Sequence, residues 1–460
     1  MSGLPLPEPG AEAQWVGAHL SGLFMGAVAP SKRFRGGQTA ADAALDTFAV
    51  RGYASRRSEV WPVSARGASG LSPWIRHGLI TLPRAWAHVD GGPARDVDRF
   101  RDELMWQEYA RHVYARLGPA IGRPLRAGPP PSKGSDPARA LDPRMACLDL
   151  VVGEMERDGW MVNQSRMWLA SHWAVRHGLR WQDGELWMRR RLLDGSRAAN
   201  ALGWQWTAGT ATGRRYGFAK GQVERRAPGV CDSCELARAC PIAAWPPDDV
   251  PPPVEPSPLL RRDPDPDSTA GPLAPEGSGH PEGVWITAES MGDDDPALAA
   301  NPDLPAVFVF DQGYLTSLRP SASRLVFIAE CLADLSMRRP VQVQRGDPVA
   351  VLAGSRLAAT YTPVPGWRTR AAVIAPVQVH PWPWLRRPGT GSVASFSTWR
   401  GAAPGRGRAR CGQGRRPALH PPGPRPHPDA HGGREHRPVT PARQAQPPAL
   451  QVAQGAGARA

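Results

Sequence analysis

Seven tryptophans lie within the 48 residues from Gly159 to Trp206, interleaved with arginine, aspartate, asparagine and methionine. A buried core is built mainly from leucine, isoleucine and valine, which have no side-chain N–H group to satisfy. Large rings mixed with charged and amide side chains therefore predict a wall around a large, flat, polar ligand. A tryptophan-rich helical core without a ligand is the simpler alternative.

Short helices would turn the polar side chains of this stretch toward one ligand. Asn163, Arg166 and Met167 follow i, i+3 and i+4 spacing, which places them on one helical face. A second helix is expected to begin after the turn at Asp194–Ser196 and to end near Asn200. We expect a break at Gly203, which would place the last two tryptophans beyond that helix.

Two upstream segments carry further candidate binding groups. Residues 68–72, with the sequence ASGLS, precede Pro73 and a predicted helix, and such a turn can bind an anion through free backbone N–H groups. An ordinary helix N-cap has the same appearance. Glu103, Trp106 and Gln107 share one face of another predicted helix. For an isolated segment, a solvated glutamate on an amphipathic helix is the simpler interpretation.

The cysteines suggest a metal site. Cys231, Cys234 and Cys240 have the spacing C-x2-C-x5-C-P, and thiolates this close in sequence are often metal ligands. Cys147 is the candidate fourth ligand. Ligand type alone does not choose between an iron–sulfur cluster and zinc, and free thiols remain an alternative. Cys331 lies in a predicted buried helix and is interpreted as a core residue.

The chain of 460 residues is long enough for two or three domains, and 41% hydrophobic residues allow real cores. The net charge of +14 is uneven, because residues 401–460 hold ten arginines against one aspartate and one glutamate. That leaves only +6 for the other 400 residues. The overall charge therefore overstates the case for a nucleic-acid partner.

The composition predicts four parts. Residues 1–245 are mostly helical, and residues 246–282 form a Pro/Asp-rich linker expected to bury no core. Residues 283–390 alternate short apolar runs with helices, which predicts a Rossmann-like α/β domain with a parallel sheet. Residues 391–460 are predicted to be a disordered basic tail, which could add non-specific DNA affinity or have no role.

The N-terminal residues have neither a basic start nor a long apolar run, so no signal peptide is expected. No stretch approaches 18 uninterrupted apolar residues, which predicts no membrane span. Three clustered cysteines are unlike a disulfide framework. These features predict a cytoplasmic protein, which we expect to be a monomer.

The tryptophan-rich stretch resembles the flavin-binding core of the DNA photolyase/cryptochrome family. The residues that carry this resemblance, in the family's order, are Asn163, Arg166, Met167, Trp181, Asp194, Asn200, Trp204 and Trp206. The resemblance implies that FAD is bound by a mostly helical domain. It also implies light-dependent repair of cyclobutane pyrimidine dimers in UV-damaged DNA.

The resemblance assigns roles around the flavin ring. Asp194 would pair with Arg166 and hydrogen-bond the isoalloxazine edge, while Asn200 would face the flavin N5. Trp204 and Trp181 would relay electrons that reduce the flavin. The third, surface tryptophan of the usual relay is not identified from the sequence.

The resemblance also assigns the phosphate and lesion sites. The segment containing Ser69, Leu71 and Ser72 matches the family's phosphate-binding run, and Tyr53 matches a flavin-contacting tyrosine. Residues that match the lesion cavity are Glu103, Trp106, Met167 and Trp206. The flipped dimer would stack on the two tryptophans, and the glutamate would hydrogen-bond it.

Several positions depart from the family pattern. Ala68 lacks the usual hydroxyl group, Phe100 replaces a tryptophan, and Ser196 replaces an aspartate. Gln107 replaces an arginine; an amide can hydrogen-bond a flavin phosphate but cannot neutralise its charge. Asn163, Arg166, Gln107 and Ser196 nevertheless remain candidate flavin contacts.

The cysteine layout resembles the iron–sulfur branch of this family, and a structural [4Fe–4S] cluster is the favoured interpretation. Residues 283–390 resemble the family's antenna domain, here placed after the flavin domain instead of before it. Because domain termini usually lie at the surface, such a permutation is tolerable. Whether an antenna chromophore binds there is left open.

Three alternatives remain at this point. The same fold could act as a cryptochrome-like blue-light photoreceptor, or it could repair (6–4) photoproducts instead of cyclobutane dimers. A different class is a DNA-binding iron–sulfur module without photochemistry. Glu103, Trp106 and Met167 favour repair among these.

Overall fold

A six-stranded sheet forms one part of the molecule, with strand order β1-β4-β3-β2-β5-β6. Its strands are β1 (Gly3–Leu4), β2 (Gly283–Ile286), β3 (Ala306–Asp311), β4 (Val341–Gly346), β5 (Leu357–Thr360) and β6 (Gln378–His380). Neighbouring strands from β2 to β6 pair in parallel, and β1 pairs antiparallel with β4. The mostly parallel sheet predicted for residues 283–390 is confirmed.

The computed structural model describes residues 3–129, 134, 137–246 and 251–401. All of them belong to one unit, Met1–Pro404. Most of the tail predicted to be disordered lies outside the described residues.

The sheet strands follow from their apolar runs. In β3 the first five residues of AVFVFD are buried, as expected for a strand covered on both faces. Aspartates cap the helices that follow strands: Asp295 caps α13 (Pro296–Ala300), Asp311 caps α14 (Gln312–Leu318) and Asp347 caps α16 (Pro348–Leu352). The remaining helices of this part are α15 (Ala322–Ser336) and α17 (Pro365–Ile374).

Residues 11–226 are mostly helical, as predicted. The helices are α1 (Glu12–His19), α2 (Gln38–Thr47), α3 (Tyr53–Arg56), α4 (Ser72–Arg76), α5 (Leu82–His88), α6 (Ala94–Leu117), α7 (Ala146–Asp158), α8 (Asn163–Ser171), α9 (Trp181–Arg191), α10 (Arg197–Ala208) and α11 (Lys220–Arg226). A π-helical turn, His172–Arg176, continues α8. The long helix α6 packs on α10 and α3.

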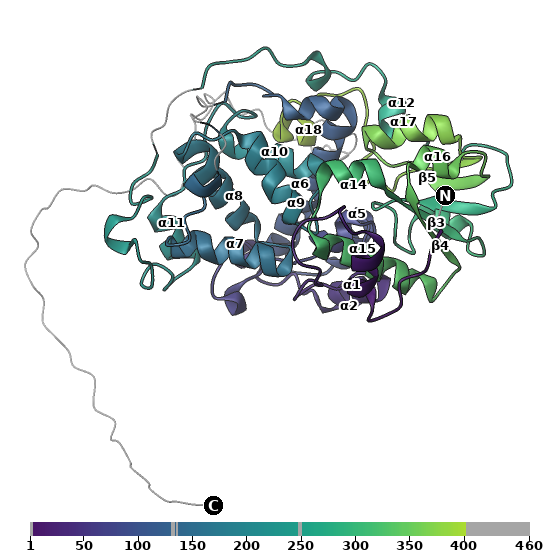
Figure 1. The fold of residues 1–460 in the computed structure, drawn as a ribbon. Coiled ribbons are helices and arrows are strands. Elements are labelled where there is room, and N and C mark those ends of the chain that lie inside the picture. The colour runs from purple at the N-terminus through teal and green to yellow at the C-terminus, as the bar shows by residue number, and fades with distance from the viewer. Residues whose placement is uncertain (1–2, 130–133, 135–136, 247–250, 402–460) are drawn as a thin grey trace, which may run out of the picture. The chain divides into compact units, whose positions relative to one another are not determined.

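The N-terminal segment joins the sheet instead of staying with the helical part. Helix α1 packs on α15, and the two lie side by side in Figure 1. One apolar core contains Val16 and Phe34 together with Phe308 and Leu325. A two-residue strand such as β1 offers no periodicity, so sequence patterns could not reveal it. The domain boundaries themselves stay a prediction.

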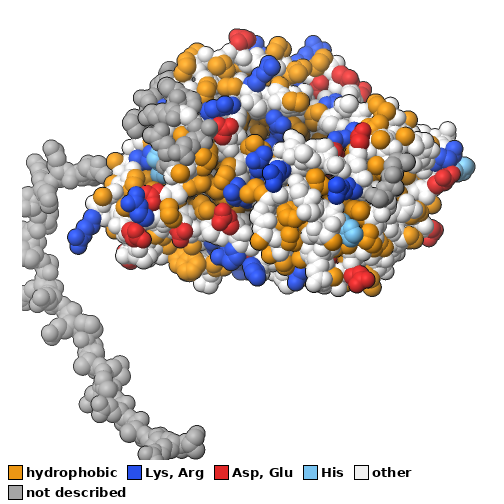
Figure 2. Space-filling model, viewed as in Figure 1, with side chains coloured by type: hydrophobic (Ala, Val, Ile, Leu, Met, Phe, Trp, Pro, Cys, Tyr) orange, Lys and Arg blue, Asp and Glu red, His pale blue; other side chains and the backbone are white. Residues whose placement is uncertain are grey.

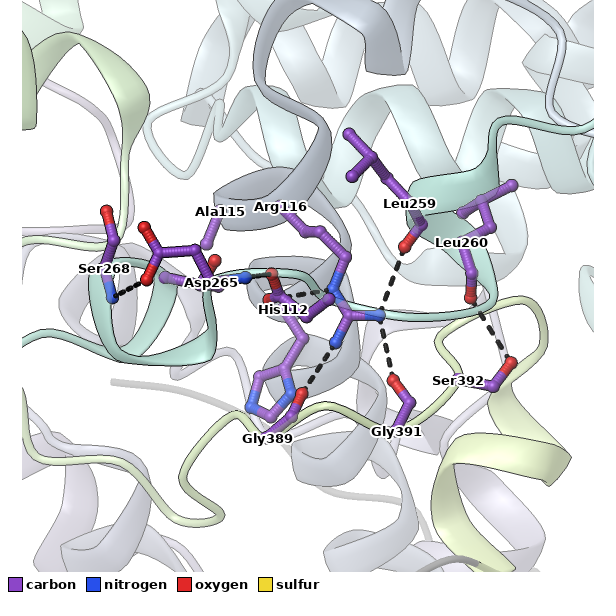
Figure 3. Close-up of polar contacts among 12 residues, drawn as sticks. His112, Ala115, Arg116, Leu259, Leu260, Asp265, Ser268, Gly389, Gly391 and Ser392 are labelled. Atoms are coloured by element: carbon purple, nitrogen blue, oxygen red, sulfur yellow. Dashed lines mark hydrogen bonds and ion pairs between the residues drawn. The ribbon is translucent and has the colours of Figure 1, made fainter.

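The segment interpreted as an unpacked linker is folded where the structure describes it. Its two helical turns are Pro258–Leu260 and α12 (Pro266–Ala270), and Leu260 and Ala270 are buried. Arg116 of α6 explains the packing, because its guanidinium donates to Asp263 and to the carbonyl of Leu259. Figure 3 shows this arginine reaching Gly389 and Gly391 as well. The prediction that this linker buries no core was wrong.

Residues 391–401 are also folded, although the sequence placed them in the disordered tail. They include α18 (Phe396–Gly401), which packs on α6. Trp399 is buried there, and its indole Nε1 donates to His112 at 2.9 Å. Composition alone misled the prediction, because two aromatic residues are enough to dock one short helix.

Candidate functional site

The strongest polar feature of the tryptophan-rich stretch is the ion pair between Arg166 and Asp194. Nη2 of Arg166 lies 2.7 Å from Oδ2 of Asp194, and its Nε donates to the carbonyl of Met161. The Asp194 side chain is only 5% exposed. Its other oxygen, Oδ1, is buried and has no hydrogen-bond partner among the described residues. An unsatisfied buried carboxylate oxygen is costly, so a ligand N–H or O–H group fits here.

The turn carrying Asp194 also positions Ser196 and Asn200. Ser196 is the N-cap of α10, and its hydroxyl accepts from the backbone N–H of Ala199 at 3.5 Å. Asn200 is buried and donates from Nδ2 to the carbonyl of Ser196 at 2.8 Å. The predicted turn and helix start are correct, but Asn200 lies in the first turn of α10 and not near its end.

Helix α10 continues through Gly203, where the sequence suggested a break. Trp204 and Trp206 therefore belong to the same helix as Asn200. A single glycine weakens a helix by only about 1 kcal/mol, which tertiary packing overrides. Trp204 is buried, whereas Trp206 is exposed and lies beside Tyr216, with ring centroids 5.6 Å apart.

The buried tryptophans form a connected set that differs from the predicted one. The rings of Trp204 and Trp173 are 6.3 Å apart, and those of Trp173 and Trp187 are 6.2 Å apart. Gly184 permits this approach, because a Cβ atom there would collide with Trp204. Trp181 is buried, but no ring contact links it to Trp204 in the described part of the chain. Sequence reasoning missed Trp173 and Trp187, although both lie in the same stretch.

The predicted phosphate-binding run has an unexpected local structure. The N-cap of α4 is Leu71, and no serine side chain caps this helix. The hydroxyl of Ser72 accepts from the indole of Trp160 at 2.9 Å, and that of Ser69 accepts from the N–H of Leu71 at 3.4 Å. With five residues, α4 has only a small dipole to offer an anion.

Tyr53 and Leu71 lie in the apolar core. Tyr53 packs its ring against Phe48 and Phe100, and burial raises the pKa of its phenol. Leu71 belongs to the same core. Both side chains therefore position backbone and neighbours more than they present polar groups.

The α6 residues occupy different environments. Glu103 is about one-third exposed and accepts from Nε of Arg57 on α3 at 3.0 Å. Trp106 stacks on Phe396 of α18, with centroids 4.0 Å and planes 12° apart. Gln107 is half-buried. On α8, Asn163 donates to Sδ of Met167 at 3.7 Å. Across the described residues, no ring contact joins Trp106 to Trp206.

Three of the four candidate cysteine ligands lie around one small core. Cys147 of α7 packs with Val223 and Ile242, and Cys231 and Cys240 lie against the same small core. Burial, and to a smaller extent the neighbouring thiols of Cys231, Cys234 and Cys240, raise the pKa of the Cys147 thiol to about 12. No set of three or more His, Cys, Asp or Glu residues in the described ranges has an arrangement that could hold one metal ion.

The sheet part of the molecule supports the Asp194 turn directly. Arg324 of α15 donates to the backbone carbonyls of Arg189 and Leu192, which precede this turn. Burial lowers the pKa of Arg324 to about 10. Gly195 has no room for a Cβ atom, because the Arg324 guanidinium and the Arg189 carbonyl are too close. On the face shown in Figure 2, basic side chains gather around a hollow near α6 and α9.

Comparison with known proteins assigns this region. Residues 145–223 match the family model described as the FAD binding domain of DNA photolyase. This segment is similar to the photolyase/cryptochrome family. The matched residues include the Arg166–Asp194 pair, Asn200 and the connected tryptophans.

Several photolyase relatives are similar over part of the chain. The deoxyribodipyrimidine photo-lyases of Agrobacterium fabrum and Synechococcus sp. are 31% and 28% identical over 198 and 202 residues. A Cryptochrome DASH of Natronomonas pharaonis is 27% identical over 221 residues. These matches cover 38%, 37% and 42% of this chain and 38%, 38% and 44% of the relatives. The chain thus aligns with about two-fifths of their length.

Two solved photolyase/cryptochrome structures are also similar. A bacterial class III photolyase from Agrobacterium tumefaciens is 28% identical with a TM-score of 0.33, over 38% of each chain. A Synechocystis cryptochrome is 23% identical with a TM-score of 0.39, covering 43% of this chain and 44% of the other.

Within the described residues, none of the helices is both long and apolar enough to cross a membrane.

Proposed function

We propose that this protein binds FAD and repairs cyclobutane pyrimidine dimers in UV-damaged DNA in a light-dependent reaction. The observation that carries the proposal is the buried Arg166–Asp194 pair, whose carboxylate has one oxygen without a hydrogen-bond donor among the described residues. It lies within the residues that match a photolyase FAD-binding model. A flat ligand with an N–H group at its edge would satisfy this oxygen.

The residues around this pair fit a flavin. Arg166 is hydrogen-bonded to Asp194, and Asn200 lies in the first turn of α10, where it donates to the carbonyl of Ser196. When bound and reduced, FAD supplies the electron that light transfers to the lesion. The protein's part is to position the ring, to exclude water and to tune the electrostatics around it.

On the lesion side, Glu103, Trp106, Met167 and Trp206 remain the proposed contacts. The exposed ring of Trp206 offers a face on which an extruded base can stack. The carboxylate of Glu103 can accept from a base N–H group after exchange with Arg57, because both side chains are partly exposed. Extruding a damaged base costs less than extruding a well-stacked one, which favours lesions.

For electron supply, the geometry favours a route through Trp204, Trp173 and Trp187. Trp187 is half-buried, with the Arg191 guanidinium 4.2 Å from its ring centroid. This set extends from a buried ring to one near the surface. Trp181, the relay member predicted from the resemblance, has no ring contact with Trp204 among the described residues.

The four cysteines are proposed to hold a structural [4Fe–4S] cluster. The electrostatic interaction of Cys147 with the other three thiols supports this proposal. Cys234→Ser should remove the iron–sulfur absorption of protein purified without air, while Cys331→Ser should leave it unchanged. Equal iron content in both variants would contradict this assignment, and bound zinc would replace it.

The decisive experiment is repair of an oligonucleotide with a single thymine dimer, in light and in darkness, by protein purified with its flavin. We expect repair only in light. Intact flavin without repair would support the second candidate, a cryptochrome-like photoreceptor. The stacking of Phe396 on Trp106 favours that candidate, because the lesion-side ring is already covered. A parallel oligonucleotide with a (6–4) photoproduct would identify the lesion.

The proposal also includes the protein's partners and state. UV-damaged DNA is the proposed partner, and a cytoplasmic monomer remains the expected form. An antenna chromophore bound by the sheet part stays a prediction, which extraction of pigments from the purified protein would test.

A further inference from the structure

Helix α9 of the helical part ends against the beginning of α15 of the sheet part. A helix leaves its last four carbonyl groups without partners inside the helix. In α9 these are the carbonyls of residues 189–192, because the last N–H to donate back into the helix is that of Leu192, to Met188. All four carbonyls accept a hydrogen bond from Ser321 or Arg324 of α15. We call this contact the α9–α15 joint.

Ser321 directs both of its donors to the joint. Its backbone N–H donates to the carbonyl of Arg190 at 2.7 Å, and its hydroxyl donates to the carbonyl of Arg191 at 3.3 Å. Ser321 is the N-cap of α15, but its side chain makes no capping hydrogen bond to that helix. Because an N-cap serine usually caps its own helix, the hydroxyl here serves the end of α9 instead.

Arg324 brings a buried charge to the joint. Its Nε donates to the carbonyl of Leu192 at 2.7 Å, and its Nη2 donates to that of Arg189. In the described part of the chain its hydrogen bonds go to backbone carbonyls and not to a carboxylate. The negative end of the α9 dipole stabilises this cation. A buried guanidinium is costly to leave without acceptors, so Arg324 keeps these carbonyls in place.

Asp194 comes directly after the joint. The carbonyl of Leu193 lies 3.2 Å from Nε2 of His77, and the ring of that histidine packs on α15. On the other side, a Cβ atom at Gly195 would lie 2.0 Å from Nη2 of Arg324. The backbone on both sides of Asp194 is therefore packed against α15 or against a residue that contacts α15.

We propose that Ser321 and Arg324 are positioning residues for the bound flavin, because they fix the turn that carries Asp194. The inference rests on the proposed function, since it requires the flavin to contact Oδ1 of Asp194. Neither residue touches the flavin. If the turn is only partly populated in its binding form, the apparent flavin affinity falls by the same fraction. By reciprocity, bound flavin stabilises the joint as much as the joint improves flavin binding.

The first test is titration of the flavin-free, full-length protein with FAD, followed by flavin fluorescence. Arg324→Gln removes the charge and most of the donors, and it should weaken FAD binding about 10-fold or more. Arg324→Lys keeps the charge and should restore part of this affinity. Ser321→Ala loses one side-chain hydrogen bond but keeps the backbone N–H, so it should weaken binding about 2- to 5-fold.

Two positions at the far end of α15 provide matched controls. The hydroxyl of Ser336 donates to a carbonyl within α15, and Arg338 pairs with Asp334 and Asp293. Ser336→Ala and Arg338→Gln remove the same kinds of group away from α9. FAD affinity should change less than about twofold in both. Losses equal to those of Ser321→Ala and Arg324→Gln would show that the joint has no special role.

The second test uses the unmodified protein. Amide hydrogen exchange with and without saturating FAD measures whether flavin stabilises the joint. The N–H of Ser321 should exchange about 10-fold more slowly with FAD bound, the same factor by which Arg324→Gln weakens binding. In Arg324→Gln saturated with FAD this slowing should be lost. A merely structural arginine would lower stability without making exchange at Ser321 depend on flavin.

The outcomes separate the two proposals. Unchanged FAD affinity in a folded Arg324→Gln variant, or equal exchange at Ser321 with and without FAD, would overturn the positioning role while leaving flavin binding intact. If circular dichroism shows that Arg324→Gln does not fold, Ser321→Ala and the exchange measurement on the unmodified protein still decide. If the unmodified protein binds no FAD, the proposed function itself fails.

Discussion

Phe396 lies flat against Trp106, with the two ring centroids 4.0 Å apart and the planes 12° apart. Helix α18 holds it there through the buried Trp399 and through an ion pair of 2.7 Å between Arg400 and Asp102. An extruded base would stack on a tryptophan in the same geometry. Phe396 therefore covers one face of Trp106.

Replacing Phe396 should expose this face. Phe396→Ala is expected to raise affinity for a thymine-dimer oligonucleotide about 2- to 10-fold, since an aromatic pair contributes roughly 0.5–1.5 kcal/mol beyond its buried area. Fluorescence anisotropy with damaged and undamaged oligonucleotides measures this gain. Ser397→Ala, at an exposed position of the same helix, should have no effect. A gain that survives in the double variant with Trp106→Ala would show that the tryptophan is not involved.

Arg116 should be a major stabilising residue. Its side chain and that of Asp263 are almost fully buried, and it also holds three backbone carbonyls (Figure 3). Arg116→Ala leaves a buried carboxylate without its cation, which should lower the free energy of unfolding by about 3–5 kcal/mol. Denaturant unfolding measures the loss. The exposed Arg95, on the same helix, should tolerate alanine within about 0.5 kcal/mol.

Electron supply should depend on Trp173 more than on Trp181. Trp173→Phe interrupts the ring contacts to both Trp204 and Trp187, so photoreduction of the bound flavin should slow markedly. Trp181→Phe should have a smaller effect. Absorbance of oxidised flavin during blue illumination with an external reductant follows the rate. A larger effect of Trp181→Phe than of Trp173→Phe would instead support the relay through Trp204 and Trp181 that the family resemblance implies.

Glu108 should make stability depend on pH. Burial raises the pKa of this carboxyl to about 7, and the charge of Arg111 offsets only part of that effect. The folded state therefore holds a proton more tightly than the unfolded state. The stability that the protonated Glu108 carboxyl contributes is fully present below about pH 4.5. It is lost as pH rises through 7, which lowers the free energy of unfolding by about 3 kcal/mol.

Glu108→Gln tests this dependence. The amide can still accept from the N–H of Arg386, but it does not ionise. The variant should match the unmodified protein near pH 5 and be more stable near pH 8, as measured by denaturant midpoints. Parallel stability curves for the two proteins across this range would show that the pKa of Glu108 is the same in the folded and unfolded states.

The sequence predicted the features that have a local signal, such as an apolar run, a helical period or a set of turn residues. The run AVFVFD marked β3, and the 3.6-residue period placed Asn163, Arg166 and Met167 on α8. The Asp194 turn followed from its turn residues. These signals are local, so they survive without knowledge of the rest of the chain.

Long-range partners could not be predicted in the same way. Nothing in the segment around Asp263 shows that Arg116, 147 residues earlier, will bury it. The break expected at Gly203 did not occur because α10 is stabilised by packing on α6 and α8. The ring contacts of Trp173 with Trp187 and Trp204 depend on how α9 and α10 pack, which the sequence does not show.

The pairing of β1 with β4 has a consequence for biosynthesis. Gly3 aligns with Gln344, so the first strand leaves the ribosome about 340 residues before its partner. At translation rates of about 5–20 residues per second, this delay is roughly 20 seconds to a minute. During that time the N-terminal segment has no sheet to join, and the apolar face of α1 has no α15 to cover it. A nascent chain of this protein should therefore depend on chaperones until synthesis reaches the fourth strand.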